Sequence, residues 1–219
     1  MNYKRITLVA GHYGSGKTNI AVNMALELKN MYNNVAIADL DIVNPYFRTK
    51  DSQEEFEKAG IRLICSEYAN SNVDIPALPQ DMYSIIDDKQ LMAVVDIGGD
   101  DRGAYALGRY SDGIVSEDNY DMLFVINKYR PLTRNSEDVI EVMHEIESAG
   151  KIKFTGIINN SNLGEETTAQ DVLDSLDYAE DVSLKTGLPV VMTCAKETIC
   201  SELGQVKNLF PLRLQKKII

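Results

Sequence analysis

The sequence predicts an α/β fold in three layers, with a mainly parallel sheet of seven strands between helices. The first observation is that short apolar segments typical of strands alternate with segments of helical periodicity along most of the 219 residues. The second is that the strand segments are continuous apolar runs, which indicates a parallel sheet covered on both faces. The strands are expected at 6–10, 35–38, 61–65, 91–95, 122–126, 154–158 and 190–193.

Helices are expected between these strands, where apolar residues recur about every 3.6 positions. After the first strand this pattern covers residues 20–31, and apolar positions at 139–149 mark a second helix that ends at Gly150. A capping box is expected at 167–170, followed by one helix that Gly187 stops. Shorter helices are expected to end at residue 59 and to lie within 102–111 and 197–208.

The chain is expected to form one domain over residues 1–219, because no linker, repeat or low-complexity segment interrupts it. Residues 66–79 contain Asn, Ser and two prolines, and are expected to form a loop long enough to have a function. The tail, 209–219, mixes apolar and basic residues around Pro211. We expect this tail to pack on the domain rather than to anchor it to a membrane.

Charge and cysteine content narrow the function classes. The net charge of −11 argues against non-specific binding to nucleic acid or to an anionic membrane. The three cysteines form no C-x-x-C pair, so neither a disulfide framework nor a cysteine metal site is suggested. No apolar run approaches the roughly 20 residues that span a bilayer, and the N-terminal run does not have the pattern of a signal peptide. A cytoplasmic location is expected.

Residues 11–18 have the sequence GHYGSGKT and match G-x-x-x-x-G-K-[ST], the phosphate-binding loop of nucleoside triphosphatases. The motif lies between a predicted strand and a predicted helix, which is the context that it requires. Such a loop needs backbone N–H groups turned towards phosphate with little steric bulk, and glycine supplies both. The start of the following helix adds the positive end of its dipole.

The loop assigns roles to its residues. Lys17 would contact the β- and γ-phosphates, and the hydroxyl of Thr18 would bind Mg²⁺. The expected nucleotide-binding set consists of Gly11, Gly14, Ser15, Gly16, Lys17, Thr18 and Asn19.

Acidic residues follow two of the predicted strands. Asp96 ends an apolar run in the manner of a Walker B motif and would hold Mg²⁺ directly or through water. Gly98 and Gly99 behind it would let this segment approach the γ-phosphate and move when that phosphate leaves. Asp39 and Asp41 are two residues apart, so in an extended segment they lie on the same side. One would support Mg²⁺ through water, and the other would orient the attacking water or a substrate group.

Together these segments resemble the MinD/ParA/CobQ–CobB branch of P-loop proteins, a SIMIBI-type group. The resemblance rests on GHYGSGKT, on ADLDIVNP after the second strand and on VVDIGGD after the fourth, with weaker support from GIINN and PVVMTC. It implies that Asp41 helps to activate the attacking water and is catalytic together with Lys17. It also implies that Asp39 and Asp96 belong to the Mg²⁺ shell and that Asn159 contacts the adenine.

The sequence departs from this branch at His12. Many MinD and ParA proteins carry a lysine at this position, which reaches the phosphates of a partner across a nucleotide-sandwiched dimer. Nucleotide-dependent dimerisation therefore does not follow from the resemblance.

ATP is favoured over GTP. Guanine specificity usually uses N-K-x-D, whose carboxylate accepts two N–H groups of the base. Residues 127–130 have Arg130 at the place of that carboxylate, and residues 159–162 offer amides but no carboxylate.

Two functions are compatible with these motifs. The first is a Mg²⁺-dependent ATPase with low intrinsic turnover that acts as a nucleotide-controlled switch or assembly factor, with a protein partner or a second copy of itself. The second is an ATP-dependent small-molecule ligase or kinase of the CobQ–CobB or dethiobiotin-synthetase type. It would use residues 66–79 and 98–103 to hold a carboxylate substrate.

Overall fold

The computed structural model describes residues 3–40, 53–65, 80–99 and 101–214. Its centre is one sheet of eight strands in the order β3-β2-β4-β1-β5-β6-β7-β8, in which every pairing is parallel. The predicted α/β fold with a parallel sheet is confirmed, with one strand more than expected. The strands are β1 (Ile6–Ala10), β2 (Val35–Asp39), β3 (Arg62–Ile64), β4 (Met92–Asp96), β5 (Tyr120–Ile126), β6 (Gly156–Asn159), β7 (Val190–Lys196) and β8 (Leu209–Leu212).

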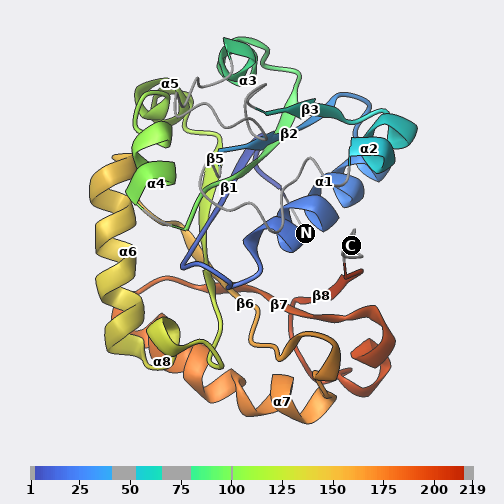
Figure 1. Ribbon diagram of the computed structural model, residues 1–219, viewed down its shortest axis with the longest axis vertical. Coiled ribbons are helices and arrows are strands. Elements are labelled where there is room, and N and C mark those ends of the chain that lie inside the picture. The colour runs from blue at the N-terminus through green and yellow to red at the C-terminus, as the bar shows by residue number, and fades with distance from the viewer. Residues whose placement is uncertain (1–2, 41–52, 66–79, 100, 215–219) are drawn as a thin grey trace, which may run out of the picture.

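Helices cover both faces of the sheet (Figure 1). One face carries α1 (Lys17–Met31) and α2 (Gln53–Ala59), and the other carries α4 (Asp101–Leu107), α5 (Ser111–Glu117), α6 (Ser136–Gly150) and α8 (Leu176–Thr186). The shorter elements are α3 (Tyr83–Asp87), α7 (Ala169–Asp174) and the 3-10 helices η2 (Gln80–Met82), η3 (Pro131–Thr133), η4 (Gly164–Glu166) and η5 (Glu197–Glu202). None of the helices in the described part of the chain is both long enough and apolar enough to span a bilayer.

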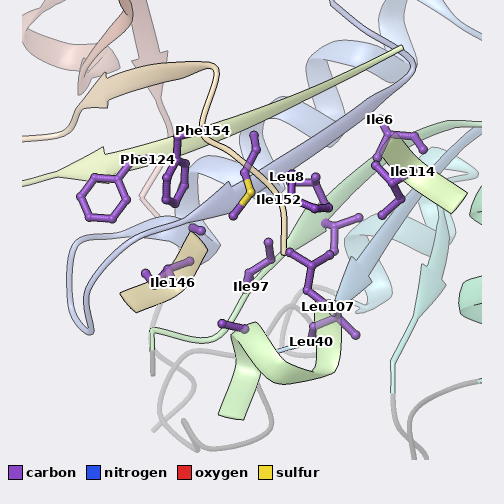
Figure 2. Close-up of a cluster of buried hydrophobic side chains, with 14 of the residues drawn as sticks. Ile6, Leu8, Leu40, Ile97, Leu107, Ile114, Phe124, Ile146, Ile152 and Phe154 are labelled. Atoms are coloured by element: carbon purple, nitrogen blue, oxygen red, sulfur yellow. The ribbon is translucent and has the colours of Figure 1, made fainter. Parts of the chain in front are cut away.

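Alternation along the central strand separates the two cores. Ile6, Leu8 and Ala10 of β1 pack towards α4, α5 and α6, whereas Val9 packs towards α1. On the first side the rings of Phe124 and Phe154 meet edge to face, with their centroids 5.0 Å apart (Figure 2). Each large apolar side chain buried here contributes about 1.5–3 kcal/mol relative to its exposed state. A sheet buried on both sides is thus held rigidly beneath its loops.

The structure contains a strand and a helix break that the sequence does not predict. The start of the tail is a strand: β8 pairs with β7 from Leu209 to Leu212, with Phe210 and Leu212 buried. The single helix expected behind residues 167–170 is two helices, α7 and α8, which meet at Ser175. The capping box of α7 is formed by Thr168 and Asp171, one residue later than expected.

The sheet order determines where the loops meet. The strand β1 lies between β4 and β5, and Asp39 at the end of β2 is in register with Asp96 at the end of β4. Because all strands run in the same direction, their carboxyl ends lie along one edge. The glycine loop, the two aspartates and the loops after β5 and β6 therefore follow neighbouring strand ends.

Candidate functional site

The loop after β1 has the backbone that its glycines predict. Gly14 and Gly16 have φ angles of 75° and 93°, and Gly11 has a φ angle of 149°. These values lie in the region that residues with a Cβ rarely adopt. Gly16 is also the left-handed cap from which α1 begins at Lys17. The strand–loop–helix arrangement of residues 6–31 thus matches the arrangement that the motif requires.

Glycine is also needed here for close packing. A Cβ on Gly11 would lie 2.6 Å from the carbonyl oxygen of Val125 in β5, and a Cβ on Gly16 would lie 2.3 Å from Nδ2 of Asn160. Both distances are shorter than real side chains allow. The loop is therefore clamped against β5 and against the segment that follows β6, which fixes its shape before any ligand binds.

Thr18 and Asp96 meet as the motifs predict. The hydroxyl of Thr18 donates a hydrogen bond of 2.6 Å to Oδ2 of Asp96, and both side chains are buried. Asp39, also buried, lies on the neighbouring strand in register with Asp96. These are hard oxygen donors of the kind that Mg²⁺ prefers.

In the described residues, no cluster of three or more His, Cys, Asp or Glu side chains is arranged to hold a metal ion. A cation at Thr18 and Asp96 would therefore depend on phosphate oxygens and water for its remaining ligands. This is usual for Mg²⁺ at phosphate sites.

Lys17 is buried inside the loop, and its Nζ donates to the carbonyl of His12 at 3.3 Å. Gly99, behind the Walker B strand, lies directly against it. A Cβ on Gly99 would be 2.8 Å from Nζ of Lys17 and 2.6 Å from the backbone nitrogen of Tyr13. The segment after β4 is thus in contact with the phosphate loop. Gly98, the residue before Gly99, packs closely on Gly103 of α4, where a Cβ on Gly103 would lie 2.5 Å from Cα of Gly98.

Asn160 fixes the segment after β6 to the phosphate loop. Its Nδ2 donates to the carbonyl of Ser15 at 2.7 Å, and this hydrogen bond is buried. Asn159, the predicted adenine contact, lies in β6 and is buried. Its amide donates to Ser175 Oγ at 2.9 Å and accepts from the hydroxyl of Ser161 at 2.8 Å. Its role at the base stays a prediction, while Asn160 is a site residue that the sequence analysis did not select.

Asn127 organises the loop after β5. Its side chain is fully buried, and its Oδ1 accepts from the backbone N–H of Tyr129 at 3.0 Å and of Asn162 at 3.3 Å. Lys128 donates to the carbonyl of Asp174, at the end of α7, at 2.7 Å. Arg130 instead lies over Gly14, with Cζ 3.3 Å from the position of a Cβ on that glycine.

His12 stands where the resembled proteins carry lysine. Burial lowers the pKa of this imidazole, and the nearby charges of Lys17 and Arg130 lower it further, against a hydrogen bond to the Tyr13 carbonyl that raises it. The ring is therefore neutral at neutral pH. His12 does not add a permanent positive charge to the loop.

Two further residues of the predicted nucleotide-binding set, Ser15 and Asn19, lie in or next to the phosphate loop. Ser15 is buried, with its Oγ near Gly11, and Asn19 lies in the first turn of α1, where its carbonyl accepts from Asn23. Asp41 and the candidate substrate loop at 66–79 lie outside the described residues. The predicted roles of these residues in binding and catalysis stay predictions.

Comparison with known proteins agrees with this architecture. No protein-family model matches the chain, and no curated protein matches it. Among solved structures, the chain is similar to the cell division protein FtsY of Thermotoga maritima, with a TM-score of 0.60 and 17% identity over 88% of this chain. It is also similar to FtsY of Mycoplasma mycoides, with a TM-score of 0.54 and 20% identity over 88% of this chain.

A third similar structure is the signal recognition particle receptor FtsY of Elizabethkingia anophelis in complex with GDP, with a TM-score of 0.52 and 15% identity over 88% of this chain. The chain spans 62%, 61% and 58% of the length of these three proteins. Such low identities show the fold alone. The chain therefore has a P-loop α/β fold of the kind seen in FtsY.

Proposed function

We propose that this chain is a Mg²⁺-dependent ATP-binding protein with low intrinsic ATPase activity, which acts as a nucleotide-controlled switch or assembly factor. The observation that carries the proposal is the hydrogen bond between Thr18 and Asp96, at the inner end of a correctly shaped phosphate loop. These residues come from distant parts of the sequence. Their contact beside the phosphate loop supports a common site for a triphosphate and its metal ion.

Each part of the site has a role in this proposal. Lys17 and the amides of the loop bind the phosphates, and Thr18 and Asp96 hold Mg²⁺, which neutralises charge on the phosphate oxygens when bound. Asp39 supports the metal shell through water. Asp41, as the resemblance to the MinD/ParA/CobQ–CobB group implies, orients the attacking water.

The contact of Gly99 with the phosphate loop supports the switch. In this structure a Cβ on Gly99 would lie 2.8 Å from Nζ of Lys17, the group expected to contact the γ-phosphate. A triphosphate would therefore have to displace this segment, and release of the γ-phosphate would let it return. The segment leads into α4, so a partner protein or a second copy of the chain would detect the change there.

The choice of ATP over GTP rests on the loops after β5 and β6. Arg130 stands where N-K-x-D would place its carboxylate. The segment after β6, which Asn160 anchors to the phosphate loop, offers amides but no carboxylate at residues 159–162. A guanine would lose the acceptor that its N–H groups require. GTP is the second candidate, because the similar FtsY of Elizabethkingia anophelis was solved with GDP. Competition between the two nucleotides distinguishes them.

The test is a fluorescence titration of an ATP analogue in the presence of Mg²⁺, with wild type, Lys17→Ala and Lys58→Ala. We expect Lys17→Ala to lose affinity by about 100-fold or more, because charge-assisted hydrogen bonds to phosphate are lost. Lys58 is an exposed lysine in α2, so Lys58→Ala controls for charge and should bind as wild type does. Equal affinity of Lys17→Ala and wild type would contradict the proposal.

A second measurement addresses the switch. The solution mass of the protein is measured by sedimentation with Mg²⁺, with and without a non-hydrolysable ATP analogue. A nucleotide-dependent dimer would support a homodimeric switch despite His12. An unchanged mass would favour the small-molecule enzyme instead, if a separate assay shows that ATP turnover requires an added small acid.

A further inference from the structure

The guanidinium of Arg130 lies on the phosphate loop. Its Cζ is 3.3 Å, and its Nε and Nη1 are 3.5 Å, from the position that a Cβ on Gly14 would occupy. Arg130 comes from the loop between β5 and η3, and β5 is the neighbour of β1 in the sheet. A cation from one strand end is thus placed on the glycine loop that follows the adjacent strand.

The backbone that carries Arg130 is tightly fixed. Its N–H donates to the carbonyl of Asn127 at 3.0 Å, and its own carbonyl accepts from Thr133 N at 3.2 Å. The hydroxyl of Thr133 donates to the same Asn127 carbonyl at 2.8 Å, and the side chains of Asn127 and Thr133 are fully buried. This hydrogen-bonded turn therefore fixes the backbone from which the Arg130 side chain extends to Gly14.

The guanidinium of Arg130 has no acidic partner within the described part of the protein. Arg5, Arg62 and Arg213 pair with carboxylates, whereas none of the ion pairs or side-chain hydrogen bonds among the described residues involves the guanidinium of Arg130. The chain has 33 acidic and 22 basic residues, so carboxylates are abundant. An exposed arginine on a phosphate loop, with no acidic partner among those residues, is suited to an anionic ligand.

We propose that Arg130 contacts the polyphosphate of the bound nucleotide at the Gly14 side of the loop, as a second cation in addition to Lys17. This inference rests on the proposed function, since it names a further ligand-binding residue of the same site. A guanidinium donates two parallel N–H groups to phosphate oxygens and keeps its charge at every physiological pH. It thereby supplies, from the same chain, positive charge that the neutral imidazole of His12 does not provide.

The test compares Arg130→Gln, Arg130→Lys and Arg134→Gln with wild type in titrations of a fluorescent ATP analogue and Mg²⁺ across a series of NaCl concentrations. Arg134 is an exposed arginine four residues later, outside the contact with Gly14, and provides the matched control. We expect Arg130→Gln to weaken binding by about tenfold at low salt and to reduce its salt dependence. Arg130→Lys should keep the salt dependence but lose part of the affinity, because one ammonium replaces two parallel N–H donors. Arg134→Gln should match wild type.

Thermal unfolding without nucleotide separates ligand binding from a structural role. Arg130 is exposed, so Arg130→Gln should unfold at the wild-type temperature. Affinity and salt dependence of Arg130→Gln equal to wild type would overturn the inference. If that result occurred while Lys17→Ala lost binding, the proposed function would stand without Arg130. If wild type bound neither ATP nor GTP analogues, the proposed function itself would fail.

Discussion

At the residue scale, two adjacent asparagines at the end of β6 have different partners. Asn159 lies in the strand and bonds to Ser175 and Ser161, whereas Asn160 bonds to the carbonyl of Ser15 in the phosphate loop. Successive residues of an extended strand point to opposite faces, so a shift of one position changes the partner completely. The motif GIINN predicts an asparagine at this site but does not indicate which of the two contacts the loop.

We expect Asn160→Ala to lower both stability and nucleotide affinity. The substitution leaves the buried carbonyl of Ser15 without its donor, at a cost of about 1–3 kcal/mol. It also removes the hydrogen bond that fixes the phosphate loop to the segment after β6. Chemical unfolding and ATP titration of the purified variant measure the two effects.

Asn159→Ala provides the comparison. The loss of its hydrogen bond to Ser175 should destabilise the junction of α7 and α8 by a similar amount. If Asn159 also contacts adenine, as the family resemblance implies, the affinity for ATP will fall more than the affinity of the loop for a phosphate ligand without adenine. Wild-type ATP affinity in this variant would remove Asn159 from the site.

At the element scale, the segment after β4 is packed too closely to accept a side chain at Gly99. A Cβ there would lie 2.6 Å from the backbone nitrogen of Tyr13, so the phosphate loop or the segment itself would have to move. We expect Gly99→Ala to cost about 1–3 kcal/mol of stability and to weaken nucleotide binding. The measurements are thermal unfolding and ATP titration.

Gly204→Ala is the matched control for this change. Gly204 is exposed, and a Cβ there would meet no atom within 4 Å. The same substitution should therefore leave ATP affinity unchanged. Unaltered affinity and stability in Gly99→Ala would mean that the contact with the phosphate loop is not maintained in solution.

The elements that the sequence predicts best are those with a strong local signal. The strands before the phosphate loop and before Asp96 are continuous apolar runs, and their positions are confirmed to within one residue. The strand β8 was missed because Pro211 lacks an N–H group. An edge strand accepts such a residue, since one of its sides has no strand neighbour.

The break at Ser175 was missed for a different reason. Apolar residues continue with helical spacing through both α7 and α8, so periodicity does not reveal an interruption. Ser175 is fully buried, and its hydroxyl accepts a hydrogen bond from Asn159, a tertiary contact that local patterns do not contain. The same hydroxyl donates to the carbonyl of Val172 in the preceding turn. The placement of Arg130 over Gly14 depends in the same way on the order of the strands.

At the scale of the whole molecule, an ionic cluster connects elements at the amino ends of the strands, opposite the candidate site. Arg5, just before β1, pairs with Glu117 at the end of α5 and donates to the carbonyl of Leu91 at 2.9 Å. Lys89 adds a second cation, 2.8 Å from Glu117. The hydrogen bond from Arg5 is the main cause that lowers the pKa of Glu117 from 4.5 to about 2, against a smaller opposing effect of burial.

This shift predicts a dependence of stability on pH. Because the pKa of Glu117 is lower in the folded than in the unfolded state, its contribution is fully present above 4.5 and is lost as the pH falls towards about 2. We expect Glu117→Gln to be less stable than wild type at neutral pH, with a difference that shrinks on acidification below 4.5. Urea unfolding over a pH series measures this difference.

Glu141→Gln controls for the loss of one exposed carboxylate in α6 and should unfold like wild type at neutral pH. A stability difference between Glu117→Gln and wild type that stayed constant from neutral pH to pH values below 4.5 would contradict the assigned pKa. Nucleotide affinity should not change in Glu117→Gln, because the cluster lies at the other ends of the strands.

The most direct test of nucleotide binding with a metal ion is the affinity for ATP with Mg²⁺ and with a chelator, in wild type and in Asp96→Asn. Wild type should bind more weakly when Mg²⁺ is removed. Asp96→Asn keeps an acceptor for Thr18 but loses the charge that holds the cation, so its affinity should depend much less on Mg²⁺. Asp112→Asn, which changes an exposed carboxylate of α5, should behave as wild type. An ATP affinity that is the same with and without Mg²⁺ in wild type, or a full Mg²⁺ effect in Asp96→Asn, would contradict the assigned site.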